Sequence, residues 1–158
     1  MTGSGAPPIN LHFEDIEIGA RFETEPHTVT SADIAVFADV THDHHPLHLD
    51  ESYATSRGFP AVIAHGLYGL SLMEGLKSML RLYDETSVAS LGWDDVRFKR
   101  PVLAGDRLHV SFRFVEKRPT RDPGRGIVIE QLELINQQGE TVIEARHVSL
   151  IVTRPPDH

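Results

Sequence analysis

The spacing of hydrophobic and polar residues divides this chain into two unlike halves. In the first half, large apolar side chains recur at helical spacing, and in the longest apolar segment, residues 61–82, they lie nearly all round a helical wheel. A helix with that pattern is buried on most sides. In the second half the apolar residues largely alternate with polar ones, which predicts strands at residues 87–102, 108–114, 127–135 and 141–153. This order predicts an α+β fold in which an antiparallel sheet covers one central helix.

Shorter elements precede the long helix. Residues 21–29 alternate enough to predict a strand. A helix should follow it, because Thr30 or Ser31 can serve as its cap and an apolar stripe comes next. Asp50 can cap a second short helix that ends at about Ser56.

Length and composition indicate an ordinary globular protein. The chain has 158 residues and no cysteine, so we expect one domain, residues 11–155, without disulfides. The Gly/Pro-rich residues 1–10 are expected to be a disordered lead-in, and they do not resemble a signal peptide. No segment is apolar for long enough to span a membrane, so a cytoplasmic protein is the simplest prediction.

The charge is negative overall but unevenly spread. A net charge of −8 argues against a general affinity for nucleic acid. Residues 97–125 nevertheless hold nine Lys/Arg against three Asp/Glu, a local charge of +6. From charge alone, solvated strand residues are the preferred interpretation; a site for an anionic ligand such as a nucleotide phosphate is the alternative.

The chemistry is concentrated in residues 41–50. Four of the ten histidines fall within seven residues there, next to Asp43 and Asp50. Pro46 should prevent a continuous helix, so we expect Asp43 and His48 to lie on a bent loop and to converge on one small site, such as a water molecule. A carboxylate and an imidazole placed in this way form a candidate general acid–base pair.

Two other interpretations of the histidine segment stay open. The residues can be solvated loop residues, with Asp43 capping a turn. They can also bind zinc or iron, although ligands crowded on one short loop converge poorly and no remote ligand stands out. His109 and His147, on predicted strands, are expected to be packing or surface residues.

Ala64, His65 and Gly66 are predicted to form the first turn of the long helix. The first N–H groups of a helix have no internal acceptor and carry partial positive charge. Because Gly66 lacks a Cβ atom, a substrate carbonyl can approach its N–H, which would form an oxyanion site. Close packing of helix and sheet explains the glycine equally well.

Three segments together resemble the MaoC-like dehydratase and (R)-specific enoyl-CoA hydratase family. They are residues 41–50 (THDHHPLHLD), residues 63–67 (IAHGL) and residues 96–102 (VRFKRPV) with the Gly-Asp turn at 105–106. The similarity covers about residues 12–153. It implies a hotdog fold, in which a curved antiparallel sheet wraps a long helix. It further implies a homodimer or higher homo-oligomer and an acyl-coenzyme A substrate of fatty acid metabolism. With the histidine ligands crowded on one loop, we expect no metal or other cofactor.

The resemblance also implies roles for particular residues. Asp43 and His48 would activate water and exchange the α-proton, while the Gly66 N–H would bind the thioester oxygen. His65 and His45 would assist in binding the substrate. His45 departs from the family loop, which usually has Asn at this position to orient the loop and the substrate through its amide. Either His45 does the same as a hydrogen-bond donor, or it changes which substrate is accepted.

Lys99 and Arg100 are the residues of the basic block that we expect to bind the phosphates of coenzyme A. They follow the strand that resembles the family signature and precede Pro101. A hydro-lyase acting on an enoyl-CoA is the leading hypothesis. A thioesterase of the same fold and a non-catalytic acyl-CoA-binding module are the alternatives.

Overall fold

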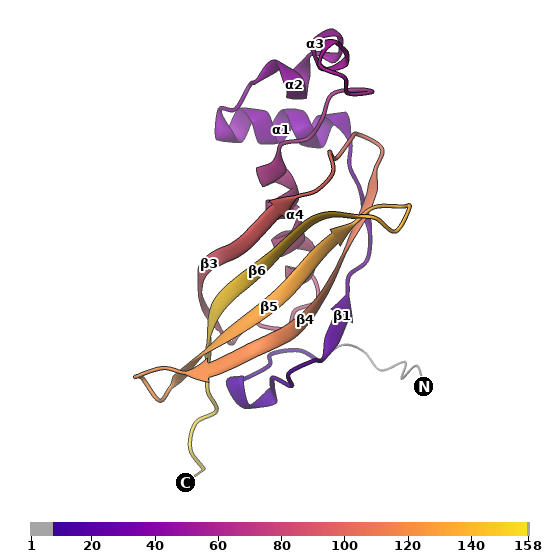
Figure 1. Cartoon of the computed structure of the whole chain (residues 1–158). Coiled ribbons are helices and arrows are strands. Elements are labelled where there is room, and N and C mark those ends of the chain that lie inside the picture. Colours follow the sequence, from indigo (N-terminus) through magenta and orange to yellow (C-terminus); the bar gives the residue numbers. More distant parts are fainter. Residues whose placement is uncertain (1–7, 158) are drawn as a thin grey trace.

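One curved antiparallel sheet dominates the computed structural model, which describes residues 8–157 (Figure 1). Within these residues the sheet has six strands, with the order β1-β4-β5-β6-β3 and with β2 pairing to β4 beside that path. The strands are β1 (Arg21–Glu23), β2 (His27–Thr28), β3 (Ser87–Phe98), β4 (Arg107–Pro119), β5 (Arg125–Ile135) and β6 (Thr141–Val152). The four long strands are those that the alternating pattern predicts.

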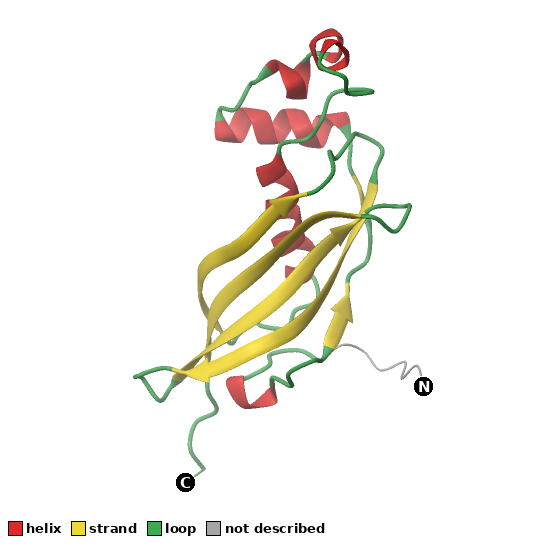
Figure 2. Cartoon of the chain, viewed as in Figure 1, coloured by secondary structure: helices red, strands yellow, loops and turns green. Residues whose placement is uncertain are grey.

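Helix α4 (Gly66–Ser78) packs against one face of this sheet, and the sheet curves round it, as Figure 2 shows. Its buried residues join the inward-facing side chains of β4, β5 and β6 in one core. At Gly69 an added Cβ atom would collide with the Ile143 side chain of β6, so the glycine permits close contact between helix and sheet. The hotdog fold expected from the sequence is confirmed.

The long helix is shorter and more exposed than its sequence predicts. It begins at Gly66, because the preceding residues are held by the chain before β4: Ala64 N–H donates to Val102 O (2.7 Å), and Ile63 forms a bridge with Leu103. The helix is also not buried on all sides, since Leu67 is 62% exposed.

Three helices, α1 (Ser31–Thr41), α2 (Pro46–Leu49) and α3 (Glu51–Ser56), cover one end of the sheet beyond the start of α4 (Figure 1). The predicted caps of two of them are confirmed. Thr30 and Asp33 form a reciprocal capping box at α1, and the Asp50 side chain accepts a hydrogen bond from Tyr53 N–H at α3. These helices carry the histidine segment.

One prediction near the N-terminus needs correction. Residues 21–29 do not form one strand but two short ones, separated by Pro26, which has no N–H to donate to a sheet. Of the expected lead-in, residues 1–7 lie outside the described residues. Asn10 is held in place, because it donates to Arg81 O (3.3 Å) and accepts from Glu85 N–H (3.0 Å). The helical turn η1 (Phe13–Asp15) follows.

A buried ionic network joins the C-terminal half of α4 to the sheet. Lys77 of α4 and Glu130 of β5 are 3% and 0% exposed, with 2.6 Å between Nζ and Oε2. Lys77 Nζ also donates to His147 Nδ1 of β6 (2.9 Å), and the Tyr83 hydroxyl donates to Glu130 Oε1 (2.7 Å). Burial raises the pKa of Glu130, but the Lys77 charge and the hydrogen bonds outweigh it and lower the pKa to about 2. Glu130 is therefore ionised throughout the neutral range.

We expect Lys77→Met and Glu130→Gln each to lower the free energy of unfolding by about 3–5 kcal/mol. Lys77→Met leaves the buried Glu130 carboxylate without a counter-charge, and Glu130→Gln leaves the buried Lys77 with only the more exposed Glu74, 2.9 Å away. The double variant Lys77→Met/Glu130→Gln should lose less free energy of unfolding than the two single variants lose together. Urea denaturation measures all three. Additive losses would show that the pair is not coupled.

The same network predicts a loss of stability in acid. Glu130 has a lower pKa folded than unfolded, so its contribution is complete above about pH 4.5 and is lost as the pH falls towards 2. In Glu130→Gln this part of the pH dependence should disappear.

Candidate active site

Asp43 owes its position to the way helix α1 ends. His42 takes up the left-handed conformation at the C-cap (φ 63°), which stops the helix and turns the chain. The Thr41 hydroxyl donates to Phe37 O (2.6 Å) and accepts from Asp43 N–H (3.4 Å). The exposed Asp43 carboxylate in turn accepts from His45 N–H (3.3 Å).

His48 lies on helix α2, not on the bent loop expected from the sequence. Pro46 interrupts a longer helix as predicted, but it also starts the new one, because the first helical position needs no N–H donor. His48 Nδ1 lies 2.6 Å from Ile63 O. Since a carbonyl only accepts, Nδ1 carries the proton, and Nε2 of the neutral ring is left free to accept one.

The structure brings Asp43, His48 and His65 together. One side-chain N or O atom of each residue lies within 4.8 Å of the others. His65 Nε2 donates to the backbone carbonyl of Asp43 (2.9 Å), and the rings of His48 and His65 stack with their centroids 3.7 Å apart. The sequence pairs Asp43 with His48, and the family resemblance implies a substrate-binding role for His65, but neither predicts this direct contact.

The surroundings of His48 favour its neutral form. Burial lowers its pKa below the ordinary value of 6.5, and the neighbouring His65 and His45 rings act in the same direction. The hydrogen bond to Ile63 and the Asp43 charge oppose the shift without cancelling it. At pH 7 the ring is therefore mostly uncharged, with an unshared electron pair on Nε2, as a general base requires.

The ring geometry is unfavourable for a metal ion at this cluster. A metal would need the ligand lone pairs to meet at one point about 2.0–2.1 Å from each nitrogen. The two imidazole rings are stacked with their centroids 3.7 Å apart and their planes at 26° to one another, so their in-plane lone pairs lie in separate, nearly parallel planes and converge poorly. Proton transfer requires no such convergence, and the arrangement favours acid–base chemistry.

His45 caps helix α2. Its Nδ1 accepts a hydrogen bond from Leu47 N–H (3.2 Å), and its ring packs edge-on against Tyr53 (5.8 Å between centroids). The side-chain oxygen of an Asn at this position can accept a bond of the same kind, because Asn is a preferred N-cap residue. His45 thus preserves the local fold of the loop, and its predicted contact with substrate stays a prediction.

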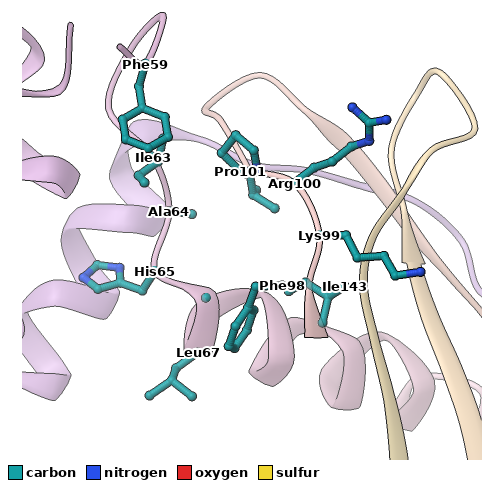
Figure 3. Close-up of a pocket in the computed structure, with 12 residues that line it drawn as sticks. Phe59, Ile63, Ala64, His65, Leu67, Phe98, Lys99, Arg100, Pro101 and Ile143 are labelled. Carbon is teal, nitrogen blue, oxygen red and sulfur yellow. The ribbon is translucent and has the colours of Figure 1, made fainter. Parts of the chain in front are cut away.

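Gly66 begins α4 beside a cavity of about 450 Å³, shown in Figure 3. A Cβ atom on Gly66 would lie 2.7 Å from the exposed Phe98 ring, so close packing is one reason for the glycine. Within the described residues, the walls come from residues 63–67, Phe98 to Val102, Phe59 and Ile143. Asp43 and His48 do not line this cavity; residues 63–66 connect it to them.

Lys99 and Arg100 lie on the cavity wall opposite His65 (Figure 3). Each has an acidic partner: Lys99 Nζ is 2.9 Å from Glu144 of β6, and Arg100 is 3.0 Å from Glu140, in the turn before β6. No other described basic residue of the block lines this cavity. Strand β4 carries the chain to the other end of the sheet, so Arg118 to Arg125 lie far from the cavity.

Two features of the site have no clear signal in the sequence. The Ile63 carbonyl, which orients His48, is a backbone group 15 residues away. Phe98 covers Gly66 from the end of β3, and only its position in the family-like segment 96–102 drew attention to it.

Comparison with known proteins identifies the family. Residues 14–133 match the model of the MaoC-like domain, which is more than half of the chain, so the chain belongs to the MaoC-like dehydratase family. Over 115 residues it is 34% identical to a 3-hydroxybutyryl-CoA dehydratase of Methylorubrum extorquens, with 73% of this chain and 71% of the relative covered.

Two solved structures of similar proteins have the same fold as this chain. A protein of Archaeoglobus fulgius described as a monoamine oxidase regulatory protein is 38% identical, with a TM-score of 0.88 over 94% of this chain and 99% of that one. The R-hydratase PhaJ1 of Pseudomonas aeruginosa is 27% identical, with a TM-score of 0.74 over 94% of both chains. In the described part of this chain, no helix has the length and hydropathy needed to cross a membrane.

Proposed function

We propose that this protein is a hydro-lyase that reversibly hydrates a 2-enoyl-CoA thioester to the 3-hydroxyacyl-CoA. The observation that carries the proposal is the neutral His48 ring, with Nε2 unprotonated, in the same cluster as the Asp43 carboxylate. Relatives named as a 3-hydroxybutyryl-CoA dehydratase and an R-hydratase support this reaction class. Cytoplasmic location and a place in fatty acid metabolism stay predictions from the sequence.

The reaction needs one base, one proton donor and one site for negative charge. As the water oxygen bonds to Cβ, His48 Nε2 accepts a proton from the water and the Asp43 carboxylate holds it by a hydrogen bond. The Cα–Cβ electron pair moves towards the thioester oxygen, where an enolate develops. The Gly66 N–H at the start of α4 donates to that oxygen. Cα then receives a proton from the pair, which completes the addition of water.

A panel of thioesters separates this proposal from its alternatives. Hydration of 2-enoyl-CoAs of short, long, branched and carboxylated chains tests the hydro-lyase, and thiol release from saturated acyl-CoAs tests the thioesterase. A binding module would bind these thioesters and convert none of them.

We expect Asp43→Asn and His48→Ala each to lower kcat for hydration by about 10²–10⁴, the usual contribution of one general acid–base group. His44→Ala is the matched control from the same loop, because the His44 ring is half exposed and, among the described residues, hydrogen-bonds only to Asp39. Its kcat should stay within about twofold of wild type. Near-normal hydration by either variant of the pair would contradict the mechanism.

Lys99 and Arg100 are proposed to bind coenzyme A phosphates, which would replace Glu144 and Glu140 as their partners. Such contacts bind the ground state and the transition state alike, so Lys99→Ala/Arg100→Ala should raise KM and leave kcat nearly unchanged. The effect should shrink at high salt, because exposed charges are screened over about 8 Å at physiological ionic strength.

The control for this prediction is Arg118→Ala/Arg121→Ala, which removes the same charge from the far end of the sheet. It should leave KM unchanged. A pantetheine thioester lacks most of the phosphates of coenzyme A. If the Lys99→Ala/Arg100→Ala variant loses as much activity on this substrate as on the CoA thioester, the two residues do not act through the phosphates.

We also propose that the protein forms a homodimer through strand β3. In the described residues this edge strand pairs with β6 on one side only, and it exposes Val88 (39%) and Leu91 (51%). A long edge with apolar side chains favours pairing with a second copy.

Light scattering at micromolar concentration should therefore show a dimer. Leu91→Lys should shift it towards monomer, whereas Val36→Lys, at an exposed apolar residue of α1, should not. A monodisperse wild-type monomer would contradict the proposal.

A further inference from the structure

His65 is a buried histidine whose side chain does not perform the task its position suggests. It is the N-cap residue of α4, yet its side chain makes no capping hydrogen bond. The residue is 4% exposed, and its ring turns away from the cavity, as Figure 3 shows. The ring points instead towards the loop between α1 and α2.

There, His65 fixes the backbone of Asp43. Residues 43–45 belong to no helix or strand, so the Asp43 carbonyl is not held by regular secondary structure. His65 Nε2–H donates to that carbonyl at 2.9 Å across 22 residues of sequence. Because this bond fixes the peptide group next to the Asp43 side chain, it restricts where the carboxylate can lie.

The same ring also restricts His48. His65 lies between Phe37 of α1 and His48 of α2, with ring centroids 5.0 Å and 3.7 Å away. The stack blocks one face of the His48 ring, while the bond to Ile63 O fixes its rotation about the side-chain axis. Both members of the proposed pair are thus held by one segment of three residues.

Placing a histidine here carries an energetic penalty that an apolar ring would avoid. Since Nε2 donates its proton, Nδ1 of the neutral ring is unprotonated, and it is buried without a hydrogen-bond partner among the described residues. An unsatisfied buried acceptor typically costs about 1–3 kcal/mol. A phenylalanine would fill the space and stack as well, so packing alone does not account for the imidazole.

We propose that His65 is a positioning residue, which holds Asp43 through its backbone carbonyl and His48 through ring stacking in the geometry that proton transfer needs. This inference rests on the proposed function. Misplacing a reacting group by about 1 Å lowers rates by about a hundredfold, so the loss should appear in kcat and not in KM.

Three variants separate the contribution of the His65 hydrogen bond from that of ring stacking. In His65→Gln the amide nitrogen lies as many bonds from the backbone as Nε2, so the donor is kept. In His65→Asn it lies one bond shorter and cannot reach Asp43, and His65→Phe keeps only the ring. We expect kcat to fall about tenfold to a hundredfold in the Asn and Phe variants, with KM within about threefold of wild type.

The kcat of His65→Gln should be at least fivefold higher than that of the Asn and Phe variants. This ratio corresponds to about 1 kcal/mol in activation free energy. Equal kcat in the Gln and Asn variants, or full activity in the Phe variant, would overturn the inference. Circular dichroism and thermal melting establish that each variant is folded. If the Phe variant does not fold, the comparison of kcat between the Gln and Asn variants still tests the inference.

Nitrogen-15 NMR of the histidine rings gives a readout that does not depend on turnover. In wild type, His65 should carry its proton on Nε2 and His48 on Nδ1. The Asn variant should shift the Asp43 amide and His48 ring signals more than the Gln variant does. A proton on His65 Nδ1, or equal shifts in both variants, would refute the positioning role. Absence of hydration by wild type would refute only the proposed function.

Discussion

Residues 63–65 are the constraint on which the site depends. Ile63 N–H donates to Leu47 O, and its carbonyl accepts from His48. Ala64 N–H then donates to Val102 O, and the His65 ring donates to Asp43 O. Three consecutive residues thus tie helix α2, the end of α1 and the chain before β4 to the start of α4. Without them the small helices would have few polar attachments to the sheet.

The sequence predicted the elements better than their ends, for a physical reason. Periodicity reports which face of an element is buried, so it predicts the four long strands and the central helix. The two helix caps follow from the residues preferred at the N-cap. Where a helix starts depends on competing long-range bonds, and at Ala64 a bond to Val102 overrides the helical pattern. In the candidate site, composition pointed to Asp43 and His48, but their contacts with Ile63 and His65 appear only when the chain is folded.

The buried ionic network was missed although part of its signal is in the sequence. Glu130 falls on the inward side of the alternation of β5, between Val128 and Leu132, and both neighbours are 0% exposed. A charged residue on that side requires a buried partner. Pattern alone could not name it, because Lys77 comes from a helix 53 residues earlier. His147, expected to be a packing or surface residue, is buried and contacts both.

The stacked histidines limit the charge that the site can hold. Two imidazolium rings 3.7 Å apart would repel each other strongly in a half-buried environment, so the stack accommodates no more than one positive charge. A single imidazolium there is balanced by the Asp43 carboxylate in the same cluster, so the three side chains together carry no net positive charge. An oxyanion formed nearby therefore meets no net positive charge from the three side chains, even after His48 has accepted the proton from water. Its stabilisation has to come from neutral dipoles, and the peptide groups at the beginning of α4 are the ones within the same structural unit.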